Sequence, residues 1–186
     1  NVVIYEPPKT GKTSLIQQTF FNMRVQTQKF TIVELSVLNI RTVADFMMRL
    51  GSAILKNTGT TRDDYSQAVQ RYLPDTHFIF DPRYLENQGT ILSLNWDIDD
   101  NDIRAIFTLP YRIAKDRDTR MYIVLEEFQN VMLTEDGDRL CHLMETVFKA
   151  RTPEDREAAC YILCGSQVNA MDAIFGHGRY FYRQAE

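Results

Sequence analysis

Apolar residues form two kinds of pattern along this chain of 186 residues. Short, mostly apolar runs at residues 2–5, 30–35, 121–125 and 158–164 have the length and the composition of β-strands. The last two runs contain no charged position, which is typical of strands in a parallel sheet that is covered on both faces.

Longer stretches between these runs carry apolar residues three and four positions apart, the spacing that predicts amphipathic helices. They cover residues 13–24, 41–57, 101–115, 138–149 and 168–175. Pro110 falls inside the third of them and is expected to bend it. Strands that alternate with helices predict an α/β fold, a three-layer sandwich with a mostly parallel central sheet.

Residues 58–102 give a weaker signal. They predict one helix, at residues 63–73, and prolines and a glycine interrupt the rest of the region. We interpret residues 58–102 as an insertion or irregular region within a single domain that spans residues 1–186. The acidic stretch at residues 97–102 lacks the glycine and the final glutamate of an EF-hand calcium loop. We interpret it as a helix start, with carboxylates at the positive end of the helix dipole.

Composition narrows the class of protein. Hydrophobic residues make up 44% of the chain and charged residues 25%, the proportions of a soluble globular domain. The net charge of −4 argues against a general nucleic-acid clamp, although a local basic patch stays open. No apolar run approaches the roughly 20 residues that span a membrane. The chain begins at Asn1 without a methionine, so we expect it to be a piece of a longer protein.

The three cysteines, Cys141, Cys160 and Cys164, form no disulfide framework, which favours a cytoplasmic protein. Cys160 and Cys164 lie on the same side of a predicted strand. A zinc site would need a second pair of ligands, and no such pair has the required spacing. We therefore expect buried, apolar cysteines.

Candidate chemistry begins directly behind the first strand, in the stretch Glu-Pro-Pro-Lys-Thr-Gly-Lys-Thr-Ser at residues 6–14. A strand, a tight loop and Gly-Lys-Thr at the start of a helix are the parts of a Walker A phosphate loop. Loop amides and the positive end of the helix dipole form an anion site there. The predicted nucleotide-binding residues are Pro8, Lys9, Thr10, Gly11, Lys12, Thr13 and Ser14.

Within this loop, Lys12 is expected to reach the outer phosphates, and the Thr13 hydroxyl to ligate Mg²⁺. Gly11 lets the backbone approach a phosphate without a Cβ atom in the way. Glu6 departs from the pattern, because the first position of a phosphate loop is normally glycine. Its carboxylate has to turn away from the triphosphate.

Two acidic residues follow the strand at residues 121–125. Ligands of open α/β sheets bind outside the carboxyl ends of the strands, where the phosphate loop also lies. We expect Glu126 to hold Mg²⁺ and Glu127 to act as the base that activates the attacking water. The alternative interpretation is a pair of solvated charges at a strand end.

Ser166 follows the strand that ends at Cys164. If that strand lies between the first strand and the acidic one, the Ser166 hydroxyl sits near the γ-phosphate and can sense its loss. Ser166 could equally cap the helix at residues 168–175, and both roles are compatible.

Three blocks of sequence together resemble the prokaryotic AAA-type ATPases often called the archaeal ATPase family, which is related to the signal-transducing STAND ATPases. They are the phosphate loop with its strand, the stretch Ile-Val-Leu-Glu-Glu-Phe-Gln-Asn at residues 123–130, and Tyr-Ile-Leu-Cys-Gly-Ser-Gln at residues 161–167 followed by Met171 and Ile174-Phe175. The blocks occur in the order of the family and span most of residues 1–175. The sequence departs from the family at Glu6, where the family has glycine, and at Glu126, where it has aspartate.

The resemblance implies binding of ATP and Mg²⁺, with Ser166 as a sensor-like residue. It also implies an arginine after the third block that stabilises charge on the γ-phosphate, either of its own site or of a neighbouring protomer; Arg183 is preferred over Arg179. A helical lid and a further domain that selects a protein partner are expected beyond residue 186.

The function that these residues predict is Mg²⁺-dependent ATP hydrolysis used as a molecular switch, with Glu127, Lys12, Ser166 and Arg183 as the catalytic set. A catalytically weakened nucleotide-binding scaffold is the first alternative, favoured by Glu6 and Glu126. A DNA-associated ATPase of a mobile element is the second.

Overall fold

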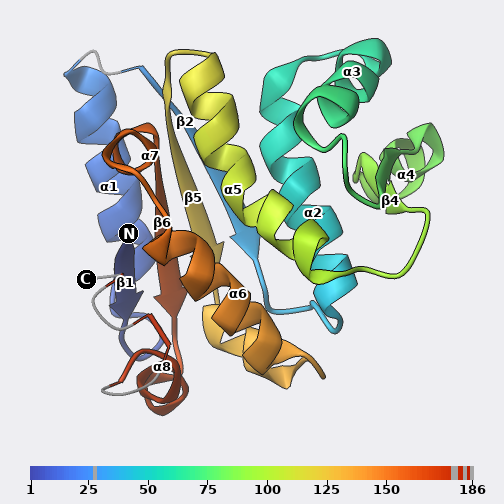
Figure 1. The fold of residues 1–186 in the computed structure, drawn as a ribbon. Coiled ribbons are helices and arrows are strands. Elements are labelled where there is room, and N and C mark those ends of the chain that lie inside the picture. The colour runs from blue at the N-terminus through green and yellow to red at the C-terminus, as the bar shows by residue number, and fades with distance from the viewer. Residues whose placement is uncertain (27–28, 177–179, 182–183, 185–186) are drawn as a thin grey trace.

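A four-stranded parallel sheet forms the centre of the protein. The structure, a computed structural model, describes residues 1–26, 29–176, 180–181 and 184. The strand order is β1 (Val2–Tyr5), β6 (Ala159–Gly165), β5 (Arg120–Glu126) and β2 (Phe30–Ser36) (Figure 1). All three pairings are parallel. The predicted α/β fold with a parallel central sheet is therefore confirmed.

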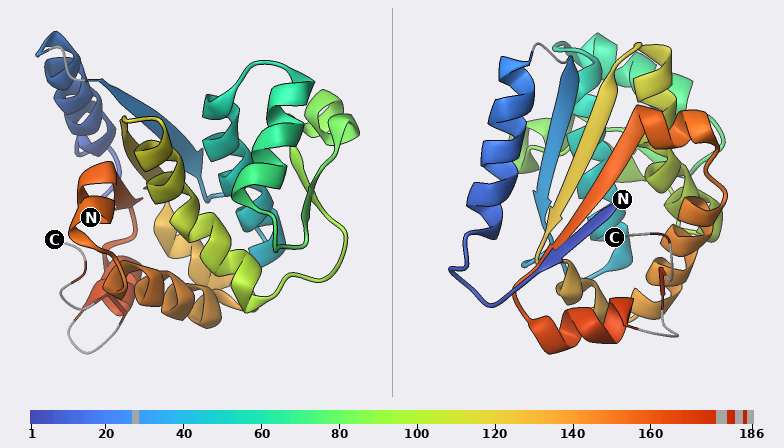
Figure 2. Two further views of the ribbon diagram at one scale, coloured as in Figure 1. Left: turned by 45° about the horizontal axis from the view of Figure 1, so that its top comes forward. Right: turned by 90° about the vertical axis from the view of Figure 1, so that its left-hand side faces the viewer.

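Helices cover both faces of this sheet and make three layers (Figure 2). Helix α1 (Lys12–Val25) packs on one face. The helices that form the larger core on the other face are α2 (Val43–Leu55), α5 (Asp100–Asp116) and α6 (Gly137–Lys149), with α7 (Pro153–Ala158) and α8 (Val168–Phe175) at the ends of β6.

The side chains of β5 explain why this strand is an unbroken apolar run. Tyr122 and Val124 point towards α1, whereas Met121, Ile123 and Leu125 point into the larger core. All five are at most 9% exposed. Successive side chains of a strand point to opposite faces, so a strand that is covered on both sides tolerates polar residues only at its ends.

The predicted helices agree with the observed ones to within about two residues, whereas the sequence pattern does not predict α7. Helix α5 begins with Asp99 as N-cap, and Asp99 and Asp102 each accept a hydrogen bond from the backbone N–H of the other. The interpretation of residues 97–102 as a helix start is therefore confirmed. Pro110 lies inside the helix.

Residues 58–102 contain more structure than their sequence predicts. The predicted helix is present as α3 (Arg62–Tyr72), after a 3-10 turn, η1 (Lys56–Thr58). Beyond it, β3 (Phe78–Phe80) and β4 (Leu92–Leu94) pair as an antiparallel sheet around α4 (Pro82–Gln88). The sequence predicts none of these three. Phe78, Ile91 and Leu92 join the core formed by α2 and α5, which makes this region a packed lobe.

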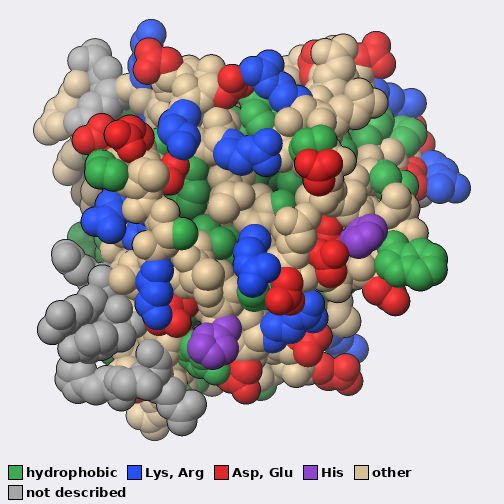
Figure 3. All heavy atoms as spheres, viewed as in Figure 1, with side chains coloured by type: hydrophobic (Ala, Val, Ile, Leu, Met, Phe, Trp, Pro, Cys, Tyr) green, Lys and Arg blue, Asp and Glu red, His purple; other side chains and the backbone are tan. Residues whose placement is uncertain are grey.

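The cysteines are all free thiols. Cys160 and Cys164 both lie against α1, as the strand spacing predicts, with Cys164 buried and Cys160 half-buried. Acidic and basic side chains alternate over the face drawn in Figure 3. In the part of the chain that the structure describes, no helix has the length and apolar composition to cross a membrane.

Two contacts between His77, directly before β3, and Asp102 of α5 connect the β3–β4 lobe to the main core. The His77 backbone N–H donates to Asp102 Oδ1 at 2.8 Å, and its ring Nδ1 lies 2.9 Å from Asp102 Oδ2. Asp102 is completely buried, whereas the His77 ring is about one-third exposed. The hydrogen bond to Asp102 is the main cause that raises the pKa of His77 above its ordinary value of 6.5.

We predict that His77 stabilises the fold most at acidic pH. Because the folded-state pKa is raised, this stabilisation is complete below the unfolded-state pKa and is lost as the pH rises through the folded-state pKa. The free energy of unfolding of His77→Gln should fall below that of the wild type by more at about pH 5.5 than at about pH 8. Urea denaturation across this range measures the difference.

The control for this experiment is His142→Gln, a change at a histidine whose side chain is 75% exposed. An equal loss of stability at both pH values in His77→Gln would contradict the prediction.

Candidate functional site

The loop between β1 and α1 leaves the strand at Tyr5 and turns back at two residues with positive φ. Lys9 has a φ of 66° and Gly11 a φ of 91°. The Thr10 hydroxyl donates to the Pro7 carbonyl at 2.9 Å and closes the turn. Glu6, Pro8, Lys9 and Thr10 are exposed. This exposed loop of alternating backbone conformation has the form of an anion-binding loop.

The N-terminus of α1 has no side-chain cap. Gly11 is the N-cap, and no side chain accepts a hydrogen bond from the first amides of the helix among the described residues. The first helical hydrogen bond runs from the Leu15 amide to the Gly11 carbonyl at 2.9 Å. The N–H groups of the first turn therefore stay available to an anion that approaches along the helix axis.

The Lys12 ammonium lies across the loop. It donates to the Glu6 carbonyl at 2.7 Å and to the Pro7 carbonyl at 3.0 Å. Thr10 Oγ1 is 3.5 Å away. The cation is thus held against the loop by two backbone oxygens.

The strand order places the candidate residues side by side, since β6 lies between β1 and β5. Tyr5 pairs with Gly165, and Leu125 pairs with Leu163. The β1–α1 loop, Ser166 and the acidic pair Glu126 and Glu127 therefore leave the sheet at almost the same level.

The Cys164 thiol lies near the end of β6, beside these residues. Burial is the main cause that raises the pKa of Cys164 to about 11. The charges of Glu126 and Glu127 act in the same direction, whereas that of Lys12 acts against it. Because Coulomb interactions fade quickly with distance, one thiol that senses all three groups lies among them.

Glu127 and Ser166 are in direct contact. The Ser166 hydroxyl donates to Glu127 Oε2 at 2.6 Å. Glu127 has a left-handed backbone, with a φ of 55° and a ψ of 41°, between β5 and the 3-10 helix η2 (Phe128–Leu133). The sharp turn that this conformation produces directs the chain away from the sheet directly after Glu126, the last residue of β5.

Gln129 belongs to the same cluster, although the sequence pattern predicted no role for it. Its side-chain amide donates to Glu127 Oε2 at 2.6 Å, the oxygen that Ser166 also contacts. Gln129 is 3% exposed, and its Oε1 atom has no hydrogen-bond partner among the described residues. The pair of polar residues Gln129 and Asn130, between Phe128 and the apolar residues 131–133, is the signal that could have pointed to it.

Gly165 makes room for this arrangement. A Cβ atom at this position would lie 2.5 Å from Met171 Sδ and 2.7 Å from Gln129 Oε1. The absence of a side chain therefore lets Gln129 and α8 close on the end of β6.

Some predicted residues are not brought into this cluster. Ser14 lines a hollow between α1 and β2. The Glu6 side chain is exposed, as expected of a carboxylate that turns away from the loop. Arg183, the predicted arginine, and its alternative Arg179 lie outside the described residues.

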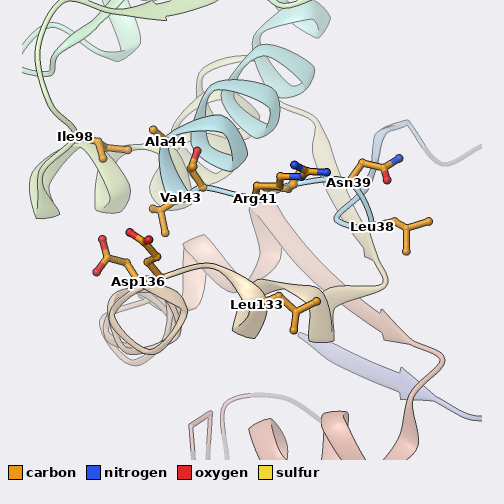
Figure 4. A pocket seen from close by; sticks show the side chains of 11 residues that line it. Leu38, Asn39, Arg41, Val43, Ala44, Ile98, Leu133 and Asp136 are labelled. Atoms are coloured by element: carbon orange, nitrogen blue, oxygen red, sulfur yellow. The ribbon is translucent and has the colours of Figure 1, made fainter.

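A larger hollow of about 690 Å³ opens further along the same end of the sheet. Figure 4 shows it between the loop after β2, which carries Leu38 and Arg41, and the segment before α6, which carries Leu133 and Asp136. The hollow lies beside the end of β5. Leu38 lines it, and the amide of the preceding residue, Val37, donates to the Glu126 carbonyl at 2.8 Å. The hollow contains none of the predicted phosphate-binding residues.

A second group of potential metal ligands, His77, Asp99 and Asp102, lies at the start of α5. The Asp102 oxygens already accept the backbone N–H groups of His77 and Asp99. With these hydrogen bonds, Asp99 and Asp102 cap the N-terminus of α5, and Asp102 holds His77, the residue directly before β3.

Comparison of the sequence with protein-family models and with curated proteins found no match. The function is therefore inferred from the geometry of the loop and of the three strand ends beside it.

We predict that replacing Gln129 by an apolar residue of similar size hardly changes the stability of the fold, whereas truncating its side chain lowers it. Gln129→Met should change the free energy of unfolding by less than about 1 kcal/mol, since it removes both a hydrogen bond to a charge and an unpaired buried oxygen. Gln129→Ala should cost about 2–5 kcal/mol, because it leaves a cavity. Urea denaturation compares the two variants, and a large loss in the methionine variant would contradict this prediction.

Proposed function

We propose that this protein binds ATP with Mg²⁺ at the β1–α1 loop and hydrolyses its terminal phosphoanhydride bond as a molecular switch. The observation that carries the proposal is the convergence of an uncapped helix N-terminus, the Lys12 ammonium and the Glu127–Ser166 hydrogen bond at the ends of three adjacent strands.

Binding is supported by the donors of the loop. The open amides at the start of α1, the Lys12 ammonium and the Thr13 hydroxyl are suited to an anion with many oxygens. The Lys12 cation now rests on two carbonyl oxygens, each of which carries only a partial negative charge. Phosphate oxygens would replace these contacts with stronger, charge-assisted hydrogen bonds.

The oxygen ligands at the site also fit a magnesium ion, which prefers carboxylates, hydroxyls and water. Thr13 and Glu126 are the residues that would hold it. When bound, such an ion neutralises charge on the phosphates and orients them. Glu126 is half-buried at the end of β5, and a glutamate reaches one methylene further than an aspartate there.

The base role is supported by the contacts of Glu127. A carboxylate near the γ-phosphate can orient a water molecule and accept its proton. Ser166 and Gln129 both donate to Glu127 Oε2, so they fix the direction in which the carboxylate points. A hydroxyl that contacts the base can also respond when the γ-phosphate leaves, which is the property that a switch needs.

A nucleotide-binding scaffold without turnover is the second candidate. The same two hydrogen bonds favour it, because Glu127 has to give up at least one of them to present Oε2 to water. The two candidates share the binding site and differ only in turnover.

We predict that Lys12→Ala weakens Mg-ATP binding at least about tenfold, because it removes a charge-assisted contact with the phosphates. Isothermal titration calorimetry measures the affinity. Lys29→Ala, a change at an exposed lysine just before β2, at the opposite end of the sheet, is the matched control and should bind like the wild type. Equal affinity of the Lys12 and Lys29 variants would contradict the proposed site.

We predict that Glu127→Gln leaves Mg-ATP affinity within about threefold of the wild type but lowers turnover about 100-fold or more, the usual loss for a general base. Phosphate release under saturating ATP measures turnover. Hydrolysis that survives this substitution would reject Glu127 as the base. Tight binding by a wild type that does not turn over would select the scaffold.

A further inference from the structure

The free edge of β2 has the properties of a docking site for an extended chain. β2 is a strand of seven residues at the end of the sheet and pairs only with β5 within the described residues. The other outer strand, β1, has four residues, and the Asn1 side chain beside it donates to the Gln184 carbonyl. β2 is therefore the longer outer strand.

The backbone direction of β2 identifies the groups that face outwards. The Val37 amide, directly after the strand, donates to Glu126 of β5. Because the direction of these groups alternates along a strand, Thr31, Val33 and Leu35 also face β5. The N–H and C=O groups of Ile32, Glu34 and Ser36 then point to the free side, spaced as a further strand would require.

A hollow lies on each side of this edge. The first, of about 550 Å³, opens between β2 and α1. Its apolar lining is Phe20, Phe21 and Ile32, and its polar lining is Ser14, Gln17, Gln18, Arg24 and Glu34. Phe21 is 62% exposed. The three apolar residues offer contacts to an apolar side chain of an added strand.

The second hollow, of about 430 Å³, opens on the opposite face of the sheet, between β2 and α2. Arg49 and Lys56 are the two cations that line it. The rest of the lining is Ile32, Val33, Glu34 and Leu35 of β2, with Ser52, Ala53, Asn57, Gly89 and Thr90. The Arg49 Nε bonds to Asp45, and the Lys56 ammonium bonds to the Gly89 carbonyl. Both side chains reach solvent, and each cation has further N–H donors. This hollow suits a carboxylate.

Because successive side chains of a strand point to opposite faces, a strand added to β2 would place alternate residues in the two hollows. We propose that the free edge of β2 binds an extended segment of a partner protein in which apolar residues alternate with acidic ones. The backbone hydrogen bonds supply affinity, and the two hollows supply the sequence preference.

A second copy of this chain is the less suitable occupant. Glu34 is the middle one of the three β2 residues whose backbone groups face outwards. Symmetric antiparallel pairing of two β2 edges centred on this residue brings Glu34 opposite Glu34 of the other copy. Like charges directly opposite each other destabilise a pair of strands. The same Glu34 discourages uncontrolled edge-to-edge association, as charged residues on outer strands commonly do.

Two seven-residue peptides test the proposal. They share phenylalanine and valine at alternate positions and carry glutamate or lysine at the positions between. Fluorescence anisotropy at low ionic strength measures their binding to the protein. The acidic peptide should bind saturably and at least about tenfold more tightly than the basic one, as expected for charge complementarity in a partly buried site.

Two variants locate the binding. Glu34→Pro removes an N–H group that faces away from β5, so the strand can stay in the sheet, and it should weaken binding of the acidic peptide at least about tenfold. The double variant Arg49→Glu with Lys56→Glu should reverse the preference towards the basic peptide. Arg156→Glu, on α7, is the charge control and should leave the preference unchanged. Circular dichroism checks that each variant is folded.

Equal affinity for both peptides, or no binding of either, would overturn the proposal. So would a folded Glu34→Pro variant that binds like the wild type. If Glu34→Pro unfolds, the double variant decides alone, because an unchanged preference there places the peptide elsewhere. None of these outcomes depends on ATP binding, so the proposal stands or falls independently of the proposed function.

Discussion

The parallel pairing of β6 with both β1 and β5 is the constraint on which the candidate site depends. It brings together three segments that are far apart in the sequence. The pairing is enforced by burial, because Tyr161 and Leu163 are completely buried on one face of β6 and Cys164 packs against α1 on the other. A slip by one residue would turn every side chain to the wrong face. The register that satisfies the core therefore also fixes which residues leave the sheet together.

The sequence allowed these strands and the residues at their ends to be predicted, for a physical reason. β5 and β6 are covered on both faces, so their composition alone indicates strands. A strand-end rule then places Glu126, Glu127 and Ser166 at the edge where the β1–α1 loop lies. The position of Lys12 at the start of α1 could be predicted because Gly-Lys-Thr follows a strand and a tight loop.

Other features could not be predicted, because they depend on contacts distant in sequence or on local backbone conformation. β3 and β4 have three residues each, too few for a periodic pattern, and their burial comes from α2 and α5. Gln129 reaches Glu127 only because Glu127 adopts a left-handed backbone that starts η2. A glutamate seldom adopts that conformation, so the local sequence does not predict the turn.

Helix α8 joins two of the strands that flank the candidate site. The Tyr5 hydroxyl, at the end of β1, donates to Asp172 at 2.7 Å, and Met171 occupies the space that Gly165 leaves open at the end of β6. One short helix is thus bonded to the strand before the β1–α1 loop and packed against the strand before Ser166. Because α8 contacts both strands, it connects their ends from outside the sheet. The distance between the β1–α1 loop and Ser166 therefore depends on the position of this helix as well as on the pairing of β1 with β6.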